Sequence, residues 1–359
     1  ILNGFFMSIV LGILYMIFIL ATQKQLIGFF ELRNPKIEQL ASQFLIISMI
    51  GTVFTFFNML FSIILNSMGN SVKPFRMNLV GFIMNLILDP LFIFGFGSFD
   101  GWGVSGAAIA TLFANIIVTI LFVLQTRTLN IFSRPLSIHT GGMNEVLKMG
   151  IPITVQRVTF TIISIIIAKI IVQWGADAIA VQRVGIQIES ISYMTIGGLQ
   201  SAIAAFIGQN YGAKQFKRIH EGYKKALFIT VIFGVCISIL LIVFPKQLFS
   251  IFLTEKASLE LGIHYLRIIG FSQVFMCMEI MTIGAFNGIG KTYIPPIFSI
   301  IFTALRIPMA LVLSIPFGLN GVWMSIAISS VFKGVVLVLW YKWTLRKMDN
   351  SILNHPIAG

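Results

Sequence analysis

Long apolar runs recur along the whole chain, and short polar connections separate them. Each run has about 20 residues, which is the length that a helix needs to cross the hydrocarbon core of a bilayer. The runs do not alternate between apolar and polar positions as the strands of a membrane barrel do. We therefore expect helices, because a helix satisfies its own backbone groups in lipid. The ten predicted helices cover about 2–22, 40–66, 75–97, 104–126, 146–173, 183–208, 222–244, 258–287, 293–316 and 319–343.

Composition supports this pattern and excludes a water-soluble enzyme with a large core. Of the 359 residues, 57% are hydrophobic and only 10% are charged, and the mean hydropathy is +0.95. A soluble domain carries about 25% charged residues. The sequence therefore predicts an all-α integral membrane protein.

Positive charge is distributed unevenly over the polar connections. When the connections are numbered from the first predicted helix, the odd ones hold six Lys or Arg residues, and the even ones with the C-terminal tail hold fourteen. The odd set is Lys24, Arg33, Lys36, Arg183, Lys246 and Lys256. The even set is Lys73, Arg76, Arg127, Arg134, Lys148, Lys214, Lys217, Arg218, Lys224, Lys225, Lys291, Lys342, Arg346 and Lys347.

Basic residues accumulate on the cytoplasmic side of membrane proteins. We therefore expect a multi-pass protein of the plasma membrane, with the C-terminal tail and the basic loop 214–225 in the cytoplasm. The net charge of +13 is a topology signal that anionic lipids reinforce, and we expect no nucleic-acid partner. Cys236 and Cys277 lie in apolar helices and are expected to be small buried side chains without a disulfide. The four histidines lack the spacing of a zinc site.

The sequence also repeats itself at an offset of about 221 residues. The repeat preserves Asn, Gly and Pro positions, which chance matches between apolar stretches rarely do. The paired stretches are "KQL" (24–26) with "KQL" (246–248), "FLII" (44–47) with "YLRI" (265–268), "NSMGNSVKP" (66–74) with "NGIGKTYIP" (287–295), and, at an offset of 218, "DPLFIFGFGSFDGWGV" (89–104) with "IPMALVLSIPFGLNGV" (307–322).

This repeat predicts two homologous lobes. The second copy begins near Glu145 and has six helices, whereas the first shows four. Position 145 minus the offset of 221 falls about 76 residues before Ile1, so we expect a twelve-helix protein that lacks its first two helices here. An even number of helices per copy gives a parallel repeat, as in secondary transporters. The predicted parts are an N-terminal lobe (1–126), a cytoplasmic linker (127–145), a C-terminal six-helix lobe (146–345) and a cytoplasmic tail (346–359).

Several words, in this order and spacing, resemble the multidrug and toxic compound extrusion (MATE) transporters. They are "NLILDPLFIFG" (85–95), "GVSGAAIAT" (103–111), "GIPITVQ" (150–156), "QIESI" (187–191), "FIGQNYGAK" (206–214), "GAFNGIGKT" (284–292) and "GLNGVW" (318–323). The resemblance covers nearly the whole chain and implies twelve helices, two lobes, and export of organic cations driven by Na⁺ or H⁺. In one branch of the family, the first helix contributes an aspartate to the coupling site, and that helix lies outside this sequence.

Asp89 is the main candidate for the coupling site. A charged side chain at mid-bilayer costs about 2.5–3.5 kcal/mol, so such residues often line ion paths. Asn85 lies one helical turn away on the same face, and Pro90 leaves the carbonyl of Leu86 without its helical donor. These hard oxygens suit a transient Na⁺, and the carboxylate alone suits H⁺. The resemblance adds Thr111 to the set. The alternative is an aspartate that caps a kinked helix or pairs with a lysine.

Four further residues are candidates for substrate binding or proton relay. Glu279 lies deep in a predicted helix, and its repeat partner is Asn58, since 279 − 221 = 58. This asymmetry suggests that Glu279 binds cationic substrate, or that it is held in a buried pair. Glu189 matches an acidic position of the family, but a pair with Arg183 or Arg157 is an equal alternative. Gln156 enters through the family resemblance alone.

The leading hypothesis is therefore an antiporter that exports amphipathic organic cations in exchange for Na⁺ or H⁺ by alternating access. We expect a monomer among membrane lipids, without a cofactor and without enzymatic activity. Two alternatives remain at this point. One is a flippase for lipid-linked oligosaccharides, and the other is an integral-membrane transferase.

Overall fold

The structure is a computed structural model that describes residues 2–28, 35–97, 99–127, 140–253 and 255–354. The chain divides into two compact units, Ile1–Leu147 and Lys148–Gly359. We call them the N-lobe and the C-lobe and describe each one separately. Most of the predicted linker 127–145 lies outside the described residues, and so does the end of the predicted tail 346–359.

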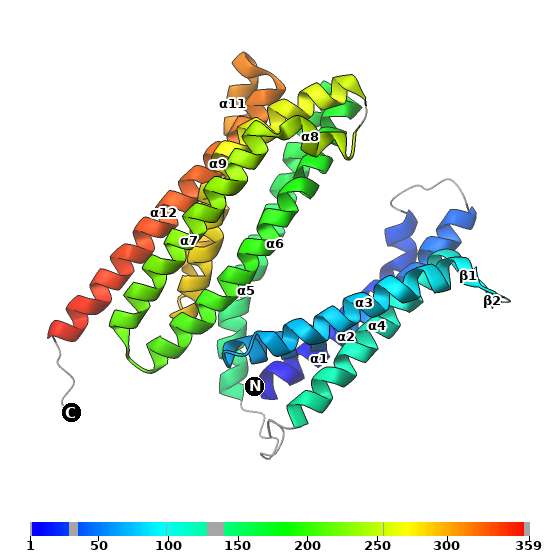
Figure 1. The fold of residues 1–359 in the computed structure, drawn as a ribbon, viewed down its shortest axis with the longest axis horizontal. Helices are drawn as coiled ribbons and strands as arrows, with labels where there is room; N and C mark the ends of the chain where they lie inside the picture. Colours follow the sequence, from blue (N-terminus) through cyan, green and yellow to red (C-terminus); the bar gives the residue numbers. More distant parts are fainter. Residues whose placement is uncertain (1, 29–34, 98, 128–139, 254, 355–359) are drawn as a thin grey trace. The chain divides into compact units, whose positions relative to one another are not determined.

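Four long helices form the N-lobe, where α2 packs against α1 and α4, and α3 packs against α4 (Figure 1). Its core joins α2 to α4 through buried aromatic and aliphatic side chains, and the rings of Phe61 and Phe122 stack with centroids 5.6 Å apart. The elements are α1 (Leu2–Gly28), α2 (Pro35–Ser67), α3 (Val72–Phe94), the hairpin strands β1 (Gly95–Phe96) and β2 (Phe99–Asp100), and α4 (Gly103–Arg127).

The C-lobe is organised around α9, which packs against α6, α7 and α12. The largest fully buried side chains of this lobe include Trp323, Tyr265 and Tyr341, and the rings of Tyr265 and Trp323 meet edge to face at 5.2 Å. The elements are α5 (Thr140–Ile171), which begins before the division, η1 (Val172–Trp174), α6 (Ala176–Gly212), α7 (Phe216–Val243), α8 (Pro245–Ser250), α9 (Lys256–Gly288), α10 (Ile294–Ala304), α11 (Arg306–Phe317) and α12 (Leu319–Asn354).

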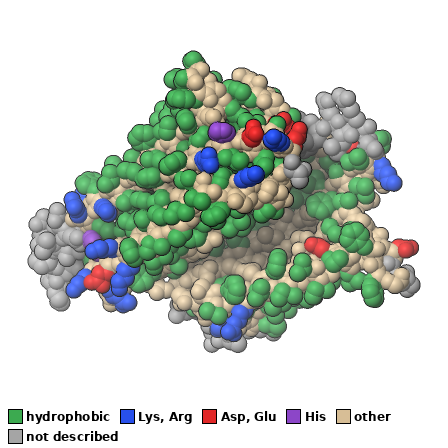
Figure 2. Space-filling model, turned by 45° about the horizontal axis from the view of Figure 1, so that its top comes forward, with side chains coloured by type: hydrophobic (Ala, Val, Ile, Leu, Met, Phe, Trp, Pro, Cys, Tyr) green, Lys and Arg blue, Asp and Glu red, His purple; other side chains and the backbone are tan. Residues whose placement is uncertain are grey.

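Within the described residues, ten segments are long and apolar enough to cross a membrane. They correspond one to one with the ten predicted helices, so the prediction of an all-α membrane protein is confirmed. Hydrophobic side chains cover most of the face seen in Figure 2, and charged side chains gather there in small groups. Phe18, Phe82 and Ile315 are among many large apolar side chains that point outward. Such an apolar surface is typical of a protein that lies in a membrane, where the side chains contact lipid tails and not water.

Three local expectations are wrong. The basic segment 214–225 was expected to be a loop, but α7 already begins at Phe216 and includes most of it. The predicted helix 293–316 is divided at Leu305 into α10 and α11. Cys236 is exposed, and only Cys277 is buried. In lipid, an exposed cysteine on an apolar helix needs no burial in protein, because the surroundings are already apolar.

Candidate functional site

Asn85 and Asp89 on α3 lie beside Thr111 on α4. The Asn85 amide Nδ2 donates to Asp89 Oδ1 at 3.2 Å and to Thr111 Oγ1 at 3.3 Å. Thr111 Oγ1 in turn donates to the carbonyl of Ala107 at 3.1 Å. The structure therefore brings together the three residues that sequence and resemblance grouped.

In the part of the chain that the structure describes, the Asp89 carboxylate has no fixed counter-charge. It is half-buried, and among the described residues no lysine or arginine forms an ion pair with it. Its Oδ2 atom accepts no hydrogen bond from any described group. Pro90 lies inside α3, so the carbonyl of Leu86 has no helical donor. A carboxylate, an amide oxygen and a free carbonyl are thus available on consecutive turns, and oxygen ligands of this kind suit a hard monovalent cation or a proton.

Asn58 occupies a separate polar contact in the N-lobe. Its side chain is 6% exposed, and its Nδ2 donates to the carbonyl of Asn115 at 3.0 Å. Thr119 Oγ1 donates to Asn58 Oδ1 at 2.8 Å. These bonds hold α2 against α4 and leave little of the Asn58 amide free for a ligand.

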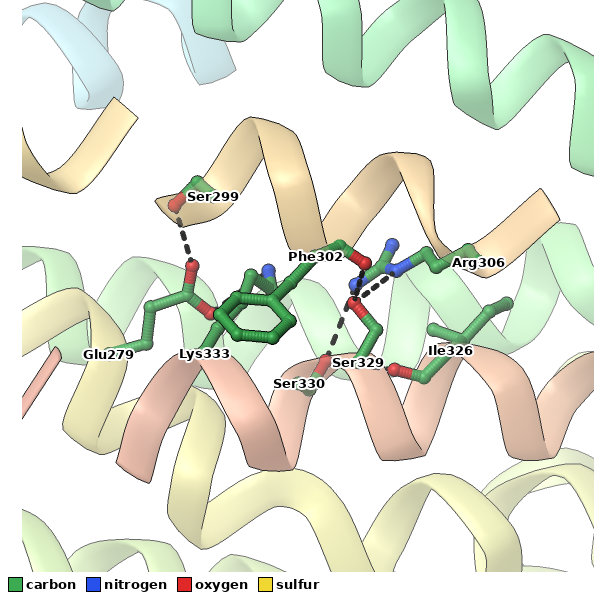
Figure 3. Close-up of polar contacts among 8 residues, drawn as sticks. All are labelled: Glu279, Ser299, Phe302, Arg306, Ile326, Ser329, Ser330 and Lys333. Atoms are coloured by element: carbon green, nitrogen blue, oxygen red, sulfur yellow. Dashed lines mark hydrogen bonds and ion pairs between the residues drawn. The ribbon is translucent and has the colours of Figure 1, made fainter. Parts of the chain in front are cut away.

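Glu279 is paired with Lys333. The Lys333 ammonium lies 3.0 Å from Glu279 Oε2, and both side chains are 8% exposed. Ser299 donates to the other carboxylate oxygen, Oε1, at 3.2 Å (Figure 3). This geometry corresponds to the buried-pair alternative, because an ammonium already neutralises the carboxylate that a cationic substrate would need.

Arg306 is buried close to this pair, and its donors go to hydroxyl groups. Nε donates to Ser329 Oγ at 3.0 Å and Nη2 to Ser330 Oγ at 3.3 Å (Figure 3). The guanidinium carbon also lies 5.8 Å from the centroid of the Phe160 ring, within the range of a cation–π contact. Among the described residues, the C-lobe interior therefore contains two cationic side chains, Arg306 and Lys333.

Glu189 contacts neutral donors, so the arginine partners suggested by the sequence are wrong. Tyr265 donates its hydroxyl to Oε1 at 2.5 Å, and Gln273 donates Nε2 to Oε2 at 3.2 Å. The amide oxygen of Gln273 is buried and has no hydrogen-bond partner among the residues that the structure describes. Gln156 is half-buried on α5 and forms no side-chain hydrogen bond with any described residue. The candidates in the C-lobe are thus spread over different contacts and do not form one site.

Several of these partners could not be predicted from the sequence. Lys333 is visible in the sequence as a base inside an apolar helix, but nothing local indicates that it meets Glu279, 54 positions earlier (333 − 279 = 54). Tyr265 and Gln273 carry no sequence signal at all. The repeat is the one signal that extends across these separations, because it aligns Lys333 with Asn115 and Glu279 with Asn58.

Ten apolar helices within the described ranges, two related lobes and a carboxylate inside a helix define a multi-pass membrane protein of the secondary-transporter class. The sequence matches the MatE family over residues 1–91 and 152–312, so the chain belongs to this family of transporters. This confirms the family resemblance and the transporter hypothesis.

Individual relatives agree with this assignment. The probable multidrug resistance protein NorM of Thermotoga maritima is 27% identical over 356 residues, which are 96% of this chain and 76% of that protein. The FAD transporter of Shewanella oneidensis is 25% identical over 280 residues, which are 76% of this chain and 61% of that protein. The chain therefore spans between about three fifths and three quarters of the length of these two relatives.

Solved structures share the fold. A crystal structure of MATE in the straight conformation superposes with a TM-score of 0.86 at 21% identity and covers 96% of this chain and 78% of that one. An outward-facing multidrug resistance MATE family transporter of the MOP superfamily gives a TM-score of 0.86 at 22% identity, covering 97% of this chain and 78% of the other. At this identity the likeness concerns the fold alone.

Proposed function

We propose that the protein exports amphipathic organic cations in exchange for Na⁺ or H⁺, and that the coupling ion binds at Asn85, Asp89 and Thr111. The observation that carries this proposal is the half-buried Asp89 carboxylate, which has neutral neighbours and no basic partner within the described part of the chain. A carboxylate without a fixed counter-charge gains the most from a mobile cation. Occupancy of this site then biases the transporter between its inward-facing and outward-facing states.

The names of the relatives support the proposed substrate class. Several of them are named multidrug resistance proteins, which supports export of varied organic compounds and does not favour an oligosaccharide flippase or a transferase. The FAD transporter introduces a second substrate class, a large organic anion. We propose organic cations as the substrates of this chain, since the site suggested for coupling is acidic. We further propose a monomer in the plasma membrane, in contact with lipids and with its C-terminal end in the cytoplasm.

Asp89→Asn tests the assignment. The full-length protein is reconstituted in vesicles, and efflux of ethidium is measured under an imposed Na⁺ or H⁺ gradient. We expect gradient-driven efflux to be abolished, because the amide retains the hydrogen bond to Asn85 but carries no charge. Amounts of inserted protein are compared by immunoblotting of the vesicles. Asp177→Asn makes the same change at an exposed aspartate in the first turn of α6; it serves as the matched control and should retain transport.

Efflux by Asp89→Asn at the rate of the unmodified protein would contradict the coupling role of Asp89. FAD is tested in parallel as a candidate substrate. If the protein moves FAD and not ethidium under the same gradient, the substrate class proposed here is wrong, whereas the coupling site is still tested by the Asp89→Asn comparison.

A further inference from the structure

The internal repeat is present in the structure as well as in the sequence. The turn at 65–70 and the turn at 286–291 form the same two backbone hydrogen bonds at an offset of 221 residues. Both turns contain a glycine with positive φ, 81° at Gly69 and 74° at Gly290. Positions in one lobe can therefore be compared with their counterparts in the other.

The C-lobe counterpart of the proposed ion site has lost its carboxylate. Asp89–Pro90 corresponds to Ile307–Pro308, since 307 − 89 = 218, and Thr111 corresponds to Ser329, since 329 − 111 = 218. The hydroxyl is thus retained while isoleucine replaces aspartate. The residue before Ile307 is Arg306, whose counterpart in the N-lobe is the apolar Leu88.

Arg306 makes the contact that belongs to the ion site in the other lobe. In the N-lobe, Thr111 Oγ1 accepts a hydrogen bond from a side chain of the preceding helix and donates to a backbone carbonyl. In the C-lobe, Ser329 Oγ accepts from Arg306 Nε at 3.0 Å and donates to the carbonyl of Phe302 at 2.8 Å. A guanidinium thus lies on the hydroxyl that is equivalent to Thr111.

At a second pair of positions, the C-lobe also has a basic side chain where the N-lobe has a neutral one. Asn58 and Asn115 form a neutral contact in the N-lobe. Their counterparts are Glu279 and Lys333, since 279 − 58 = 221 and 333 − 115 = 218, and these form the buried ion pair of the C-lobe. The carboxylate that this lobe has gained therefore arrives together with its own ammonium.

These fixed cations have a direct consequence for ion binding. Arginine remains protonated in proteins, and a like charge a few ångströms away opposes the entry of another cation, most strongly where the surroundings are apolar. Glu279 is already neutralised by Lys333 and bonded to Ser299. Neither C-lobe position offers a carboxylate free to receive Na⁺ or H⁺.

We propose that Arg306 and Lys333 are tethered cations that occupy the C-lobe counterparts of the N-lobe polar sites. This lobe then binds no coupling ion, because Glu189, its other buried carboxylate among the described residues, already accepts a hydrogen bond on each oxygen, from Tyr265 and Gln273. Each transport cycle uses one ion, which binds at Asp89. The proposal rests on the proposed function and adds to it the number of coupling ions and the residues that set this number.

The ion-to-substrate ratio of the unmodified protein is the first test. In vesicles with clamped membrane potential, an opposing ethidium gradient is increased until net ethidium movement under the Na⁺ or H⁺ gradient stops. We expect net movement to stop at the ethidium gradient that corresponds to an exchange of one ion for each ethidium. A ratio of two or more ions for each ethidium would overturn the proposal. This failure is distinct from failure of the proposed function, which is shown by Asp89→Asn retaining gradient-driven efflux.

The second test removes the Lys333 ammonium that pairs with Glu279. Lys333→Met leaves the carboxylate available, so added Na⁺ or a lower pH should raise the midpoint of thermal unfolding of the purified protein, because a ligand that binds the folded state stabilises it. Choline chloride replaces NaCl in the control buffer. Lys333→Arg keeps a tethered cation and should respond as the unmodified protein does. An equal response of Lys333→Met and Lys333→Arg would overturn the proposal at this position.

The third test restores a carboxylate to the counterpart of Asp89. Arg306→Leu with Ile307→Asp gives the C-lobe the two residues of the N-lobe sequence at these positions. We expect its ion-to-substrate ratio to rise from one to two, whereas Arg306→Lys with Ile307→Asp, which keeps a cation beside the new carboxylate, should stay at one. A ratio of one in a folded and active Leu–Asp variant would contradict the role of Arg306. If that variant does not fold, the first two tests still decide the proposal.

Discussion

Asp89 and Glu279 show how one type of side chain takes different roles according to its partner. Both are carboxylates inside apolar helices, and both stood out in the sequence for the same reason. Asp89 meets an amide, whereas Glu279 meets an ammonium at 3.0 Å. The negative charge of Asp89 can therefore attract a cation, whereas the charge of Glu279 is already neutralised by Lys333. The difference depends on which helices lie opposite, which is information that neither residue carries in its own surroundings in the sequence.

The Glu279–Lys333 pair leads to a prediction about stability. Glu279→Gln leaves the Lys333 ammonium buried without a counter-charge, and breaking a buried pair in this way typically costs about 3–5 kcal/mol. We therefore expect a large drop in the midpoint of thermal unfolding in detergent. Glu279→Gln combined with Lys333→Met removes both charges and should recover most of the loss. Equal destabilisation in the single and double variants would show that the ion pair is not the cause.

Helices in this chain were predictable as elements, but their ends and interruptions were less so. Pro308 accounts for the division between α10 and α11 at Leu305. The carbonyl of Ala304 would need the N–H of residue 308 as its helical donor, and proline lacks this group. The sequence shows that proline plainly. It does not show the outcome, since Pro90 at the equivalent position leaves α3 continuous. Neighbouring helices decide whether a proline kinks a membrane helix or divides it.

Close approach of α6 and α9 leads to a prediction about a glycine. A Cβ atom added at Gly284 would lie 2.3 Å from the carbonyl oxygen of Gln200, which belongs to rigid backbone. Gly284→Ala should therefore force the two helices apart and lower the unfolding midpoint by several degrees, since a small residue at a helix contact allows tight packing. Gly197→Ala on α6 is the matched control, because nothing lies within 4 Å of its added Cβ. A comparable loss in both variants would contradict this packing argument.

The distribution of basic residues over the chain predicts how it is oriented in the membrane. The start of α7 and the start of α9 lie at opposite ends of one membrane-spanning helix, and the first is rich in lysine and arginine. By the positive-inside rule, we expect the region of Lys214 to be cytoplasmic and that of Lys256 to be external. These two positions provide a direct comparison for a labelling experiment.

Single cysteines at these positions test the orientation. Cys236 and Cys277 are first replaced by serine, and Lys214→Cys or Lys256→Cys is then introduced. A membrane-impermeant maleimide added to intact cells should label the variant at 256 and spare the variant at 214 until the cells are permeabilised. The reverse pattern of labelling would invert the proposed topology, including the cytoplasmic placement of the C-terminal end.

The class of membrane protein, its helices and its internal duplication could be inferred from the sequence alone, because hydrophobic periodicity, composition and self-similarity are properties of the sequence. The grouping of Asn85 and Asp89 belongs here too, since one helical turn places them together. Contacts between helices could not be inferred in this way. Lys333 against Glu279, Arg306 against Ser329, and Tyr265 against Glu189 join residues 54, 23 and 76 positions apart. Such contacts arise only when helices pack, and packing sets which buried charge is already neutralised and which one can still accept an ion.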